Sequence, residues 1–283
     1  MISLSCTKGT GAGNDFVILD EFSSPLNTDL GTLTRALCDR HFGIGADGVL
    51  SLRPQLEAEF EMLYYNADGS RGAMCGNGGR CAARYARERG IAADAMRFVA
   101  LEHLYRAEVR GDAVRLTMKD PVQIDADRVL EVSGRTFRGR LLDTGAPHLV
   151  VFTEGLDGMD VESLGHALRH HADLAPQGAN VNFVERSPGA LLRLRTYERG
   201  VERETLACGT GSVASAVAGA LAAGLTSPVT IHVRSGDRLM VHFVRTGDRF
   251  SGVVLEGPAR MLFTARCRYD EASGGIVAET STA

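Results

Sequence analysis

The sequence contains little lysine and no long apolar run. By direct count Lys8 and Lys119 are its only lysines, and neither lies in a motif that matches the Schiff-base lysine of pyridoxal enzymes. No apolar stretch approaches the roughly 20 residues that a membrane-spanning helix needs. The N-terminus also lacks the charged and apolar regions of a secretory signal. We therefore expect a cytoplasmic protein that needs no pyridoxal cofactor.

The spacing of the six cysteines fits neither a zinc site nor a disulfide framework. They form no C-x-x-C pair, the sequence has no H-E-x-x-H, and the step from Cys75 to Cys81 is awkward for zinc. Disulfide frameworks are typical of short secreted chains, whereas this chain has 283 residues. We expect neither a metal nor a disulfide. Core packing is predicted for four of the cysteines, namely Cys6, Cys38, Cys81 and Cys267.

The composition is that of a soluble globular protein, with 44% hydrophobic and 23% charged residues. A net charge of -4 gives no reason to expect nucleic acid or an acidic membrane as a partner. The length allows one large domain or two of ordinary size.

One motif occurs twice, at residues 74–81 (MCGNGGRC) and 207–212 (ACGTGS). In each, a cysteine precedes Gly-x-Gly, which opens a run of small residues that tolerate a helix. At a helix N-terminus the unpaired N–H groups and the macrodipole favour the thiolate form of a thiol. Either motif alone could be a structural cysteine buried in a tight turn. Two motifs at matching places indicate a paired acid and base.

Other features repeat at the same offset as the motif cysteines. Residues 45–47 (GAD) and 178–180 (GAN) are separated by 133 positions, as are the two cysteines. Asn66 stands nine residues before the first cysteine, and Arg199 stands nine before the second. We interpret this order as an internal duplication of about half the chain.

Short apolar runs separated by turn signals predict many strands and few helices. Gly90 is expected to end the helix that follows the first cysteine. The predicted strands are 16–19, 49–52, 60–65, several within 96–118, 149–152, 231–243 and 252–255, and the predicted helices are 32–40, 79–88 and 213–222.

These elements predict an α+β fold of two pseudo-symmetric domains, each a mostly antiparallel sheet wrapped around one central helix. The helix at 213–222 is small and apolar on nearly every side, as a helix inside a sheet should be. We expect the first domain at 1–123, joined by 262–283, and the second at 124–261.

Duplicated domains of this kind would place one thiol on each face of a substrate carbon. One thiolate would then remove a proton, and the other thiol would deliver one to the opposite face. The converging helix N-termini would hold a carboxylate of the substrate.

Several polar residues near the motifs have competing interpretations. His148 leads into an apolar strand and could be a core or capping residue, but its place in the repeat favours a functional one. Glu198 and Arg199 could form a solvated turn or a clamp for a carboxylate. Surface positions are expected for His166, His170 and His171.

Seven stretches stand out along the sequence, at 8–16 (KGTGAGNDF), 39–48 (DRHFGIGADG), 66–70 (NADGS), 75–78 (CGNG), 180–183 (NVNF), 197–200 (YERG) and 207–211 (ACGTG). Together they resemble the diaminopimelate epimerase family, in the family's order and over nearly the whole chain.

The resemblance implies a cofactor-independent isomerase that interconverts LL- and meso-2,6-diaminopimelate, in the pathway to lysine and peptidoglycan. Cys75 and Cys208 match the catalytic pair, and His148 and Glu198 match residues that assist their proton transfers. The positions that match substrate-binding residues are Asn14, Asn66, Asn180, Glu198 and Arg199. Backbone donors to the reacting carboxylate match Gly76, Asn77, Gly209 and Thr210. A homodimer is compatible with the sequence.

Two positions depart from the family pattern and leave alternatives open. Ala146 replaces the asparagine of the family's Gly-Asn-Pro-His, and Gly48 stands where some members carry a glutamine. A racemase or isomerase of the same superfamily that acts on another amino acid is therefore the main alternative. A non-catalytic protein that binds amino acids in the same cleft is a second one.

Overall fold

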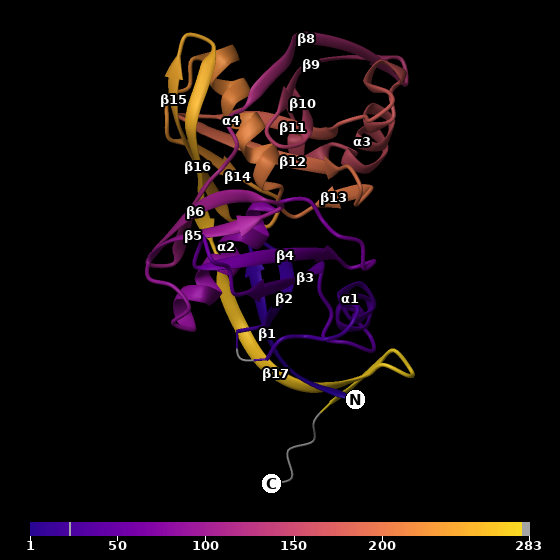
Figure 1. Ribbon diagram of the computed structural model, residues 1–283. Coiled ribbons are helices and arrows are strands. Elements are labelled where there is room, and N and C mark those ends of the chain that lie inside the picture. The colour runs from indigo at the N-terminus through magenta and orange to yellow at the C-terminus, as the bar shows by residue number, and fades with distance from the viewer. Residues whose placement is uncertain (23, 279–283) are drawn as a thin grey trace. The chain divides into compact units, whose positions relative to one another are not determined.

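The protein consists of two compact units (Figure 1). A computed structural model describes residues 1–22 and 24–278. The first unit comprises Met1–Leu116 together with the chain from Ala259 onward, and the second comprises Thr117–Pro258. Within the first unit, the yellow strand near the C-terminus lies beside the indigo strand at the N-terminus (Figure 1). The predicted fold class, an α+β fold with two repeated domains, is confirmed.

In the first unit the strands follow one another across the sheet in the order β18-β17-β1-β2-β3-β4-β5-β6-β7. Neighbours are antiparallel except for the pairs β2–β3 and β4–β5, which are parallel. The elements are β1 (Ile2–Gly11), β2 (Asn14–Asp20), α1 (Leu30–Cys38), β3 (Gly48–Arg53), β4 (Phe60–Asn66), α2 (Gly76–Glu88), β5 (Ala95–Ala100), β6 (His103–Arg110), β7 (Ala113–Thr117), β17 (Arg260–Asp270) and β18 (Gly275–Ala278).

The second unit repeats this plan. Its strand pairs are antiparallel except for β10–β11 and β12–β14. The elements are β8 (Val122–Val132), β9 (Arg135–Asp143), β10 (Pro147–Phe152), the 3-10 turn η1 (Leu156–Gly158), α3 (Val161–Arg169), the 3-10 turn η2 (Ala172–Leu174), β11 (Asn180–Ser187), β12 (Leu191–Glu198), β13 (Arg203–Thr205), α4 (Gly209–Ala223), β14 (Val229–His232), β15 (Arg238–Thr246) and β16 (Arg249–Pro258).

The strand registers correct one detail of the duplication. Phe16 pairs with Gly48 in the first unit, and His148 pairs with Asn180 in the second, so these strands repeat at a separation of 132 residues. Asn66 ends β4 and Glu198 ends β12, which makes Glu198 the counterpart of Asn66. The prediction that Arg199 is this counterpart is therefore wrong. The cysteines repeat at 133 because the second unit has one more residue between the end of its strand and its helix.

Each unit encloses one helix. In the first, α2 packs against strands β1 to β4, β6 and β17, and in the second, α4 packs against β9 to β12 and β14 to β16. Small residues allow this close approach, and residues of α4 from Gly209 to Ala220 are buried on all sides except at Thr210. Both helices begin directly after their cysteine, earlier than the predicted starts at 79 and 213, because the cysteines themselves cap them. The predicted end at Gly90, with φ of 71°, is confirmed.

The other two helices cover the outer faces of the sheets. Side chains of α1 form a core with β1, β2 and β17, in which Leu33 and Leu37 are fully buried. In the second unit α3 is packed in the same way, with Leu168 buried against Val181 and Phe183 of β11. Asp29 caps α1 by accepting from Thr32 N at 2.8 Å, so this helix begins two residues before its predicted start.

A glycine ends α4 in a conformation that other residues adopt only with strain. Gly224 has φ of 66°, and nothing lies within 4 Å of the place where a Cβ would be. Gly224→Ala is therefore expected to destabilise the protein by about 1 kcal/mol through backbone strain alone. Gly158→Ala is the control, because Gly158 has equal space and no positive φ. Chemical denaturation of both variants measures the difference, and equal stabilities would contradict the assignment.

Among the helices within residues 1–22 and 24–278, none combines the length and the apolar character needed to cross a membrane.

Candidate functional site

Cys75 caps the N-terminus of α2. Its backbone is extended (φ -104°, ψ 118°), and its Sγ accepts from Gly78 N at 3.4 Å. Its carbonyl oxygen accepts from Gly79 N at 2.8 Å and starts the helical ladder. The sulfur is thus held at the positive end of the helix dipole, where a negative charge is stabilised.

Cys208 caps α4 with the same geometry. Its φ and ψ are -118° and 116°, and its Sγ accepts from Gly211 N at 3.4 Å. Ser212 N donates to the carbonyl oxygen of Cys208 at 2.9 Å. Cys208 is 5% exposed, whereas Cys75 is half-buried. Each unit therefore contains one copy of the same arrangement, a cysteine sulfur at the N-terminus of an enclosed helix, and we call each copy a half-site.

An asparagine side chain contacts the sulfur of Cys75, and a second asparagine contacts the first. Asn14 Oδ1 lies 3.6 Å from Cys75 Sγ and 3.4 Å from Asn77 Nδ2. The amide of Asn14 is oriented by Asp47, whose carboxylate accepts from Nδ2 at 2.8 Å. Arg80 Nη2 donates to Asn77 Oδ1 at 2.9 Å and turns the NH₂ group of Asn77 towards Asn14. These predicted residues, Asn14, Cys75 and Asn77, therefore form one cluster.

A different chain of contacts leads to the sulfur of Cys208. Thr210 Oγ1 lies 3.4 Å from Cys208 Sγ and 2.9 Å from His148 Nε2. Thr144 Oγ1 donates to the carbonyl oxygen of Thr210 at 3.0 Å and anchors the first turn of α4. His148 therefore reaches Cys208 through one hydroxyl group.

The imidazole of His148 is neutral at physiological pH. Its side chain is fully buried, and burial, with a contribution from the positive charge of Arg199, lowers its pKa to about 3. A neutral imidazole has one N–H donor and one acceptor nitrogen. His148 can thus donate or accept a hydrogen bond without gaining a charge.

The remaining predicted residues of the second unit gather at the end of β12. Asn180 Oδ1 accepts from Arg199 N at 2.8 Å, and Asn180 Nδ2 donates to the carbonyl oxygen of Pro147 at 3.1 Å. Thr205 Oγ1 donates to Glu198 Oε2 at 3.0 Å. Arg199 Nη1 donates to Gln177 O at 3.4 Å. Asn180, Glu198 and Arg199 are thus held by neighbouring strand and loop atoms.

Asn66 has a local role in the structure. It ends β4, and its Nδ2 donates to Ser70 Oγ at 3.0 Å across the turn 66–70. The predicted turn chemistry is confirmed, since Asp68 Oδ1 accepts from Ser70 N at 2.8 Å.

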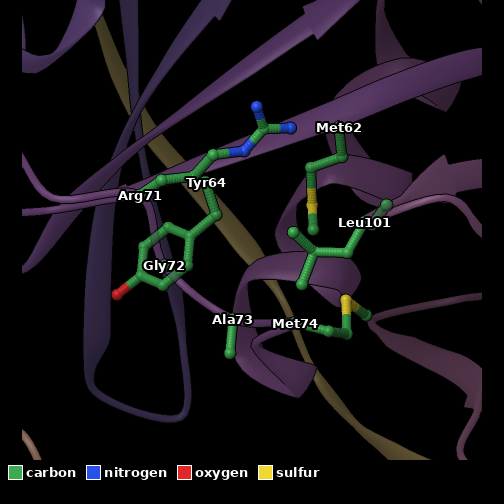
Figure 2. A pocket seen from close by; sticks show the side chains of 8 residues that line it. Met62, Tyr64, Arg71, Gly72, Ala73, Met74 and Leu101 are labelled. Atoms are coloured by element: carbon green, nitrogen blue, oxygen red, sulfur yellow. The ribbon is translucent and has the colours of Figure 1, made fainter.

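A small pocket borders the loop that precedes Cys75 (Figure 2). Its lining includes Met62, Tyr64 and Met74, the last of these adjacent to Cys75 in the chain. A Cβ at Gly72 would lie 2.3 Å from the Tyr64 ring, and one at Gly48 would lie 2.6 Å from it. The carbonyl oxygen of Tyr65, 2.5 Å from the same Cβ position, and the Tyr64 ring together therefore occupy the space that a side chain at residue 48 would need. This explains in physical terms why glycine stands at that departure from the family pattern.

The other four cysteines are confirmed as buried in the hydrophobic cores. Burial raises the pKa of Cys38 and of Cys81 to about 12. The pKa of Cys6 is also raised, first by a hydrogen bond with Cys267 and then by burial. The thiols of Cys6, Cys38 and Cys81 therefore stay protonated at neutral pH. Exposed positions are likewise confirmed for His166 and His170, while His171 is half-buried.

No cluster of three or more His, Cys, Asp or Glu side chains with metal-binding geometry occurs within the described part of the chain. All six cysteines are free thiols.

The sequence matches the family model described as diaminopimelate epimerase over residues 6–125 and 140–262. The chain belongs to the diaminopimelate epimerase family. The diaminopimelate epimerase of Chlorobaculum tepidum is 43% identical over 258 residues, which cover 90% of this chain and 97% of that protein. The diaminopimelate epimerase of Aquifex aeolicus is 38% identical over 92% of this chain and 96% of its own. Membership in this family makes the protein an isomerase.

Solved structures of more distant proteins share the fold. A Bacillus anthracis phenazine biosynthesis protein of the PhzF family superposes with a TM-score of 0.74 at 14% identity, over 94% of this chain and 99% of that one. A hydroxyproline epimerase from Agrobacterium vitis, with trans-4-hydroxy-L-proline bound, gives 0.72 at 17% identity, over 96% and 95% of the two chains. At these identities the likeness concerns the fold alone.

Several residues that support the two half-sites were not found from the sequence. In the first unit they are Asp47 and Arg80, which orient the amides around Cys75. In the second they are Asn182, which contacts His148, and Thr196, which contacts Asn182. Arg80 could have been noticed as the charged residue of the stretch 74–81, and Asn182 as the second asparagine of the stretch 180–183, whereas Thr196 lies in a strand with no distinctive pattern.

Proposed function

We propose that the protein is a cofactor-independent epimerase that interconverts LL- and meso-2,6-diaminopimelate, with Cys75 and Cys208 as its acid and base. The observation that carries this proposal is the identical capping geometry of the two cysteines, each at the N-terminus of an enclosed helix. The family relationship supplies the substrate, because the similar relatives are named as diaminopimelate epimerases.

In the proposed reaction the two half-sites act on one substrate molecule from opposite faces. The thiolate of one cysteine takes the proton from the α carbon, so the C–H bond breaks and its electron pair stays on the carbon. That pair then takes the proton of the other cysteine's S–H group on the opposite face. The configuration inverts, and the two sulfurs have exchanged their protonation states. No oxidant, reductant or metal is needed for this balance.

The helix N-termini have a second role in the proposal. Backbone N–H groups at Gly76, Asn77, Gly209 and Thr210 would bind the carboxylate next to the reacting carbon, since helix N-termini bind anions. This binding also offsets the negative charge that develops beside the carboxylate when the proton leaves.

The remaining predicted residues would hold the rest of the substrate. In the proposal, Asn14, Asn66, Asn180, Glu198 and Arg199 bind its polar groups, and His148 and Glu198 assist the proton transfers of the cysteines. We place the enzyme in the cytoplasm, in the pathway to lysine and peptidoglycan, and a homodimer is compatible with its sequence.

A racemase of another amino acid is the second candidate, favoured by the missing amide at Ala146. A panel of LL-diaminopimelate, L-proline and L-histidine separates the two under reducing conditions. Chiral chromatography of each reaction is expected to reveal a second stereoisomer only with diaminopimelate. Racemisation of proline or histidine, with diaminopimelate left unchanged, would contradict the proposed substrate. Failure to invert any of the three would favour a binding protein.

A further inference from the structure

A trio of buried polar side chains lies beneath the N-terminus of α4. His148 on β10, Asn182 on β11 and Thr196 on β12 are all at most 2% exposed. Asn182 Nδ2 lies 3.0 Å from His148 Nδ1, and Thr196 Oγ1 donates to Asn182 Oδ1 at 3.0 Å. The trio also packs against the helix, because a Cβ at Gly211 would lie 2.4 Å from Asn182 Oδ1.

The equivalent place in the first unit is filled by two aromatic rings and a leucine. The strand registers align His148 with Phe16, Asn182 with Leu50, and Thr196 with Tyr64, each 132 residues apart. Phe16 and Tyr64 pack edge to face with ring centroids 5.9 Å apart, and Leu50 lies under Gly78 of α2. The fold therefore does not require polar residues at these positions. Buried polar groups cost free energy unless they are hydrogen-bonded, so the polar trio of the second unit needs another explanation.

Backbone and hydroxyl partners fix the orientation of the Asn182 amide. Its Nδ2 lies 3.3 Å from the carbonyl oxygen of Leu149, which can only accept a hydrogen bond. Its Oδ1 accepts from the Thr196 hydroxyl. The NH₂ group therefore also faces His148 Nδ1 and can only donate to it.

This donation determines which nitrogen of the imidazole carries the proton. Nδ1 must accept, so in the neutral ring Nε2 carries the hydrogen. Nε2 lies 2.9 Å from Thr210 Oγ1, to which it then donates. With its oxygen accepting from His148, the Thr210 hydroxyl keeps its own hydrogen for Cys208 Sγ at 3.4 Å.

Asn180 does not change this assignment. Its Nδ2 lies 3.5 Å from His148 Nε2, at the limit of a hydrogen bond, whereas Thr210 Oγ1 lies only 2.9 Å from the same nitrogen. The Thr210 contact is therefore the hydrogen bond of Nε2.

We propose that Asn182 is a positioning residue that locks His148 as its Nε2–H tautomer and so directs the Thr210 hydroxyl towards the sulfur of Cys208. Its catalytic consequence rests on the proposed two-cysteine epimerase function. A hydrogen bond from Thr210 stabilises the thiolate of Cys208, the form that removes a proton. Asn182 touches neither the sulfur nor the substrate in this scheme.

The tautomer can be measured without any substrate. Protein labelled with ¹⁵N-histidine gives two-bond ¹H–¹⁵N correlations that show which ring nitrogen is protonated, and the His148 signal is the one missing from His148→Gln. The proposal predicts a protonated Nε2 and an unprotonated Nδ1 at neutral pH. A protonated Nδ1 in the wild type would overturn it, whatever the enzymatic activity.

Asn182→Leu then tests the consequence, and the first unit already holds Leu50 at the equivalent position. We expect His148 to lose its single tautomer and kcat to fall about 10-fold or more, by analogy with the cost of removing partners that orient metal-binding histidines. KM should change less than kcat, because substrate contacts are retained. Thr196→Val should also weaken the single tautomer of His148 and lower kcat. Thr196→Ser should leave both at their wild-type values, because serine keeps the hydroxyl that donates to Asn182.

Ser215→Ala is the matched control. It removes another buried hydrogen bond of the same helix, from Ser215 Oγ to Gly211 O at 2.7 Å, without touching the trio. It should leave both the tautomer and kcat unchanged. An Asn182→Leu enzyme with an intact Nε2–H tautomer and wild-type kcat would overturn the proposal. If the wild type failed to invert diaminopimelate, the proposed function would fall, while the tautomer measurement would still decide the role of Asn182.

Discussion

Replacing either Cys75 or Cys208 with alanine is expected to reduce the rate of diaminopimelate inversion by at least about 100-fold, the usual contribution of one acid or base group. Each variant removes one of the two proton carriers, and a single remaining thiol cannot serve both faces of the α carbon. Chiral chromatography of timed reactions, started from the LL and the meso isomer under reducing conditions, measures this loss in both directions.

Cys81→Ala is the matched control for that experiment. Cys81 lies in the same helix as the Cys75 half-site, but it is fully buried and its pKa is raised to about 12 by burial. Its removal should lower stability through the cavity it leaves, and should leave turnover near that of the wild type. Wild-type turnover in Cys75→Ala or in Cys208→Ala would rule out the two-base mechanism.

Removing the carboxylate of Asp15 is expected to destabilise the protein by about 3 kcal/mol, since it leaves the buried ammonium of Lys8 without its carboxylate partner. Lys8 Nζ lies 2.7 Å from Asp15 Oδ2, and the two side chains are only 8% and 18% exposed. Arg40 adds two further hydrogen bonds to the same carboxylate, at 3.2 and 3.0 Å. Denaturant unfolding of Asp15→Ala at neutral pH measures the loss.

The effect of Asp15 should depend on pH. Burial alone would raise the pKa of this carboxyl, but the hydrogen bonds and charges of Arg40 and Lys8 outweigh burial and lower it. A lowered pKa adds stability above the unfolded value of about 3.9, and that stability is lost as the pH falls through the folded value. The difference between wild type and Asp15→Ala should therefore be largest near neutral pH and shrink below about pH 4.

Asp94→Ala provides the surface comparison within the same unit. Asp94 pairs with Arg87 at 2.9 Å, but both side chains are more than half exposed. Such pairs contribute about 0–1 kcal/mol, so this variant should unfold almost as the wild type does. Equal losses of stability in Asp15→Ala and Asp94→Ala would show that burial of the Lys8–Asp15 ion pair does not determine its contribution to stability.

The sequence was sufficient to predict the plan of the fold, because its signals are local. Glycine turns and short apolar runs mark the strands, and the repeated Cys-Gly-x-Gly motif marks both enclosed helices. The register of the strands is not local. Asn66 and Glu198 correspond only because each ends a strand whose pairing is set by neighbours far along the chain. Counting nine residues back from each cysteine therefore matches Asn66 with Arg199 instead of Glu198.

The residues that orient the half-sites were hidden for a related reason. Asn182 stands in the stretch 180–183 and Thr196 in an ordinary strand, and neither is linked to His148 until the sheet places Asn182 beside His148 and Thr196 beside Asn182. Arg80 was missed because arginine in a helix is normally exposed, whereas here it is fully buried and holds Gly76 O and Asn77 Oδ1. By contrast the cysteines, Asn14 and Asn77 stand in motifs that the sequence displays directly.

Transfer of solvent hydrogen to one α carbon tests the two-cysteine mechanism most directly. LL-diaminopimelate incubated with the reduced enzyme in deuterium oxide should yield meso product that carries deuterium at the inverted carbon, as seen by mass spectrometry and NMR. Cys81→Ala should give the same product, and Cys75→Ala and Cys208→Ala should give none at a comparable rate. Meso product without deuterium, or labelled product formed at the wild-type rate by either of those two variants, would contradict the mechanism.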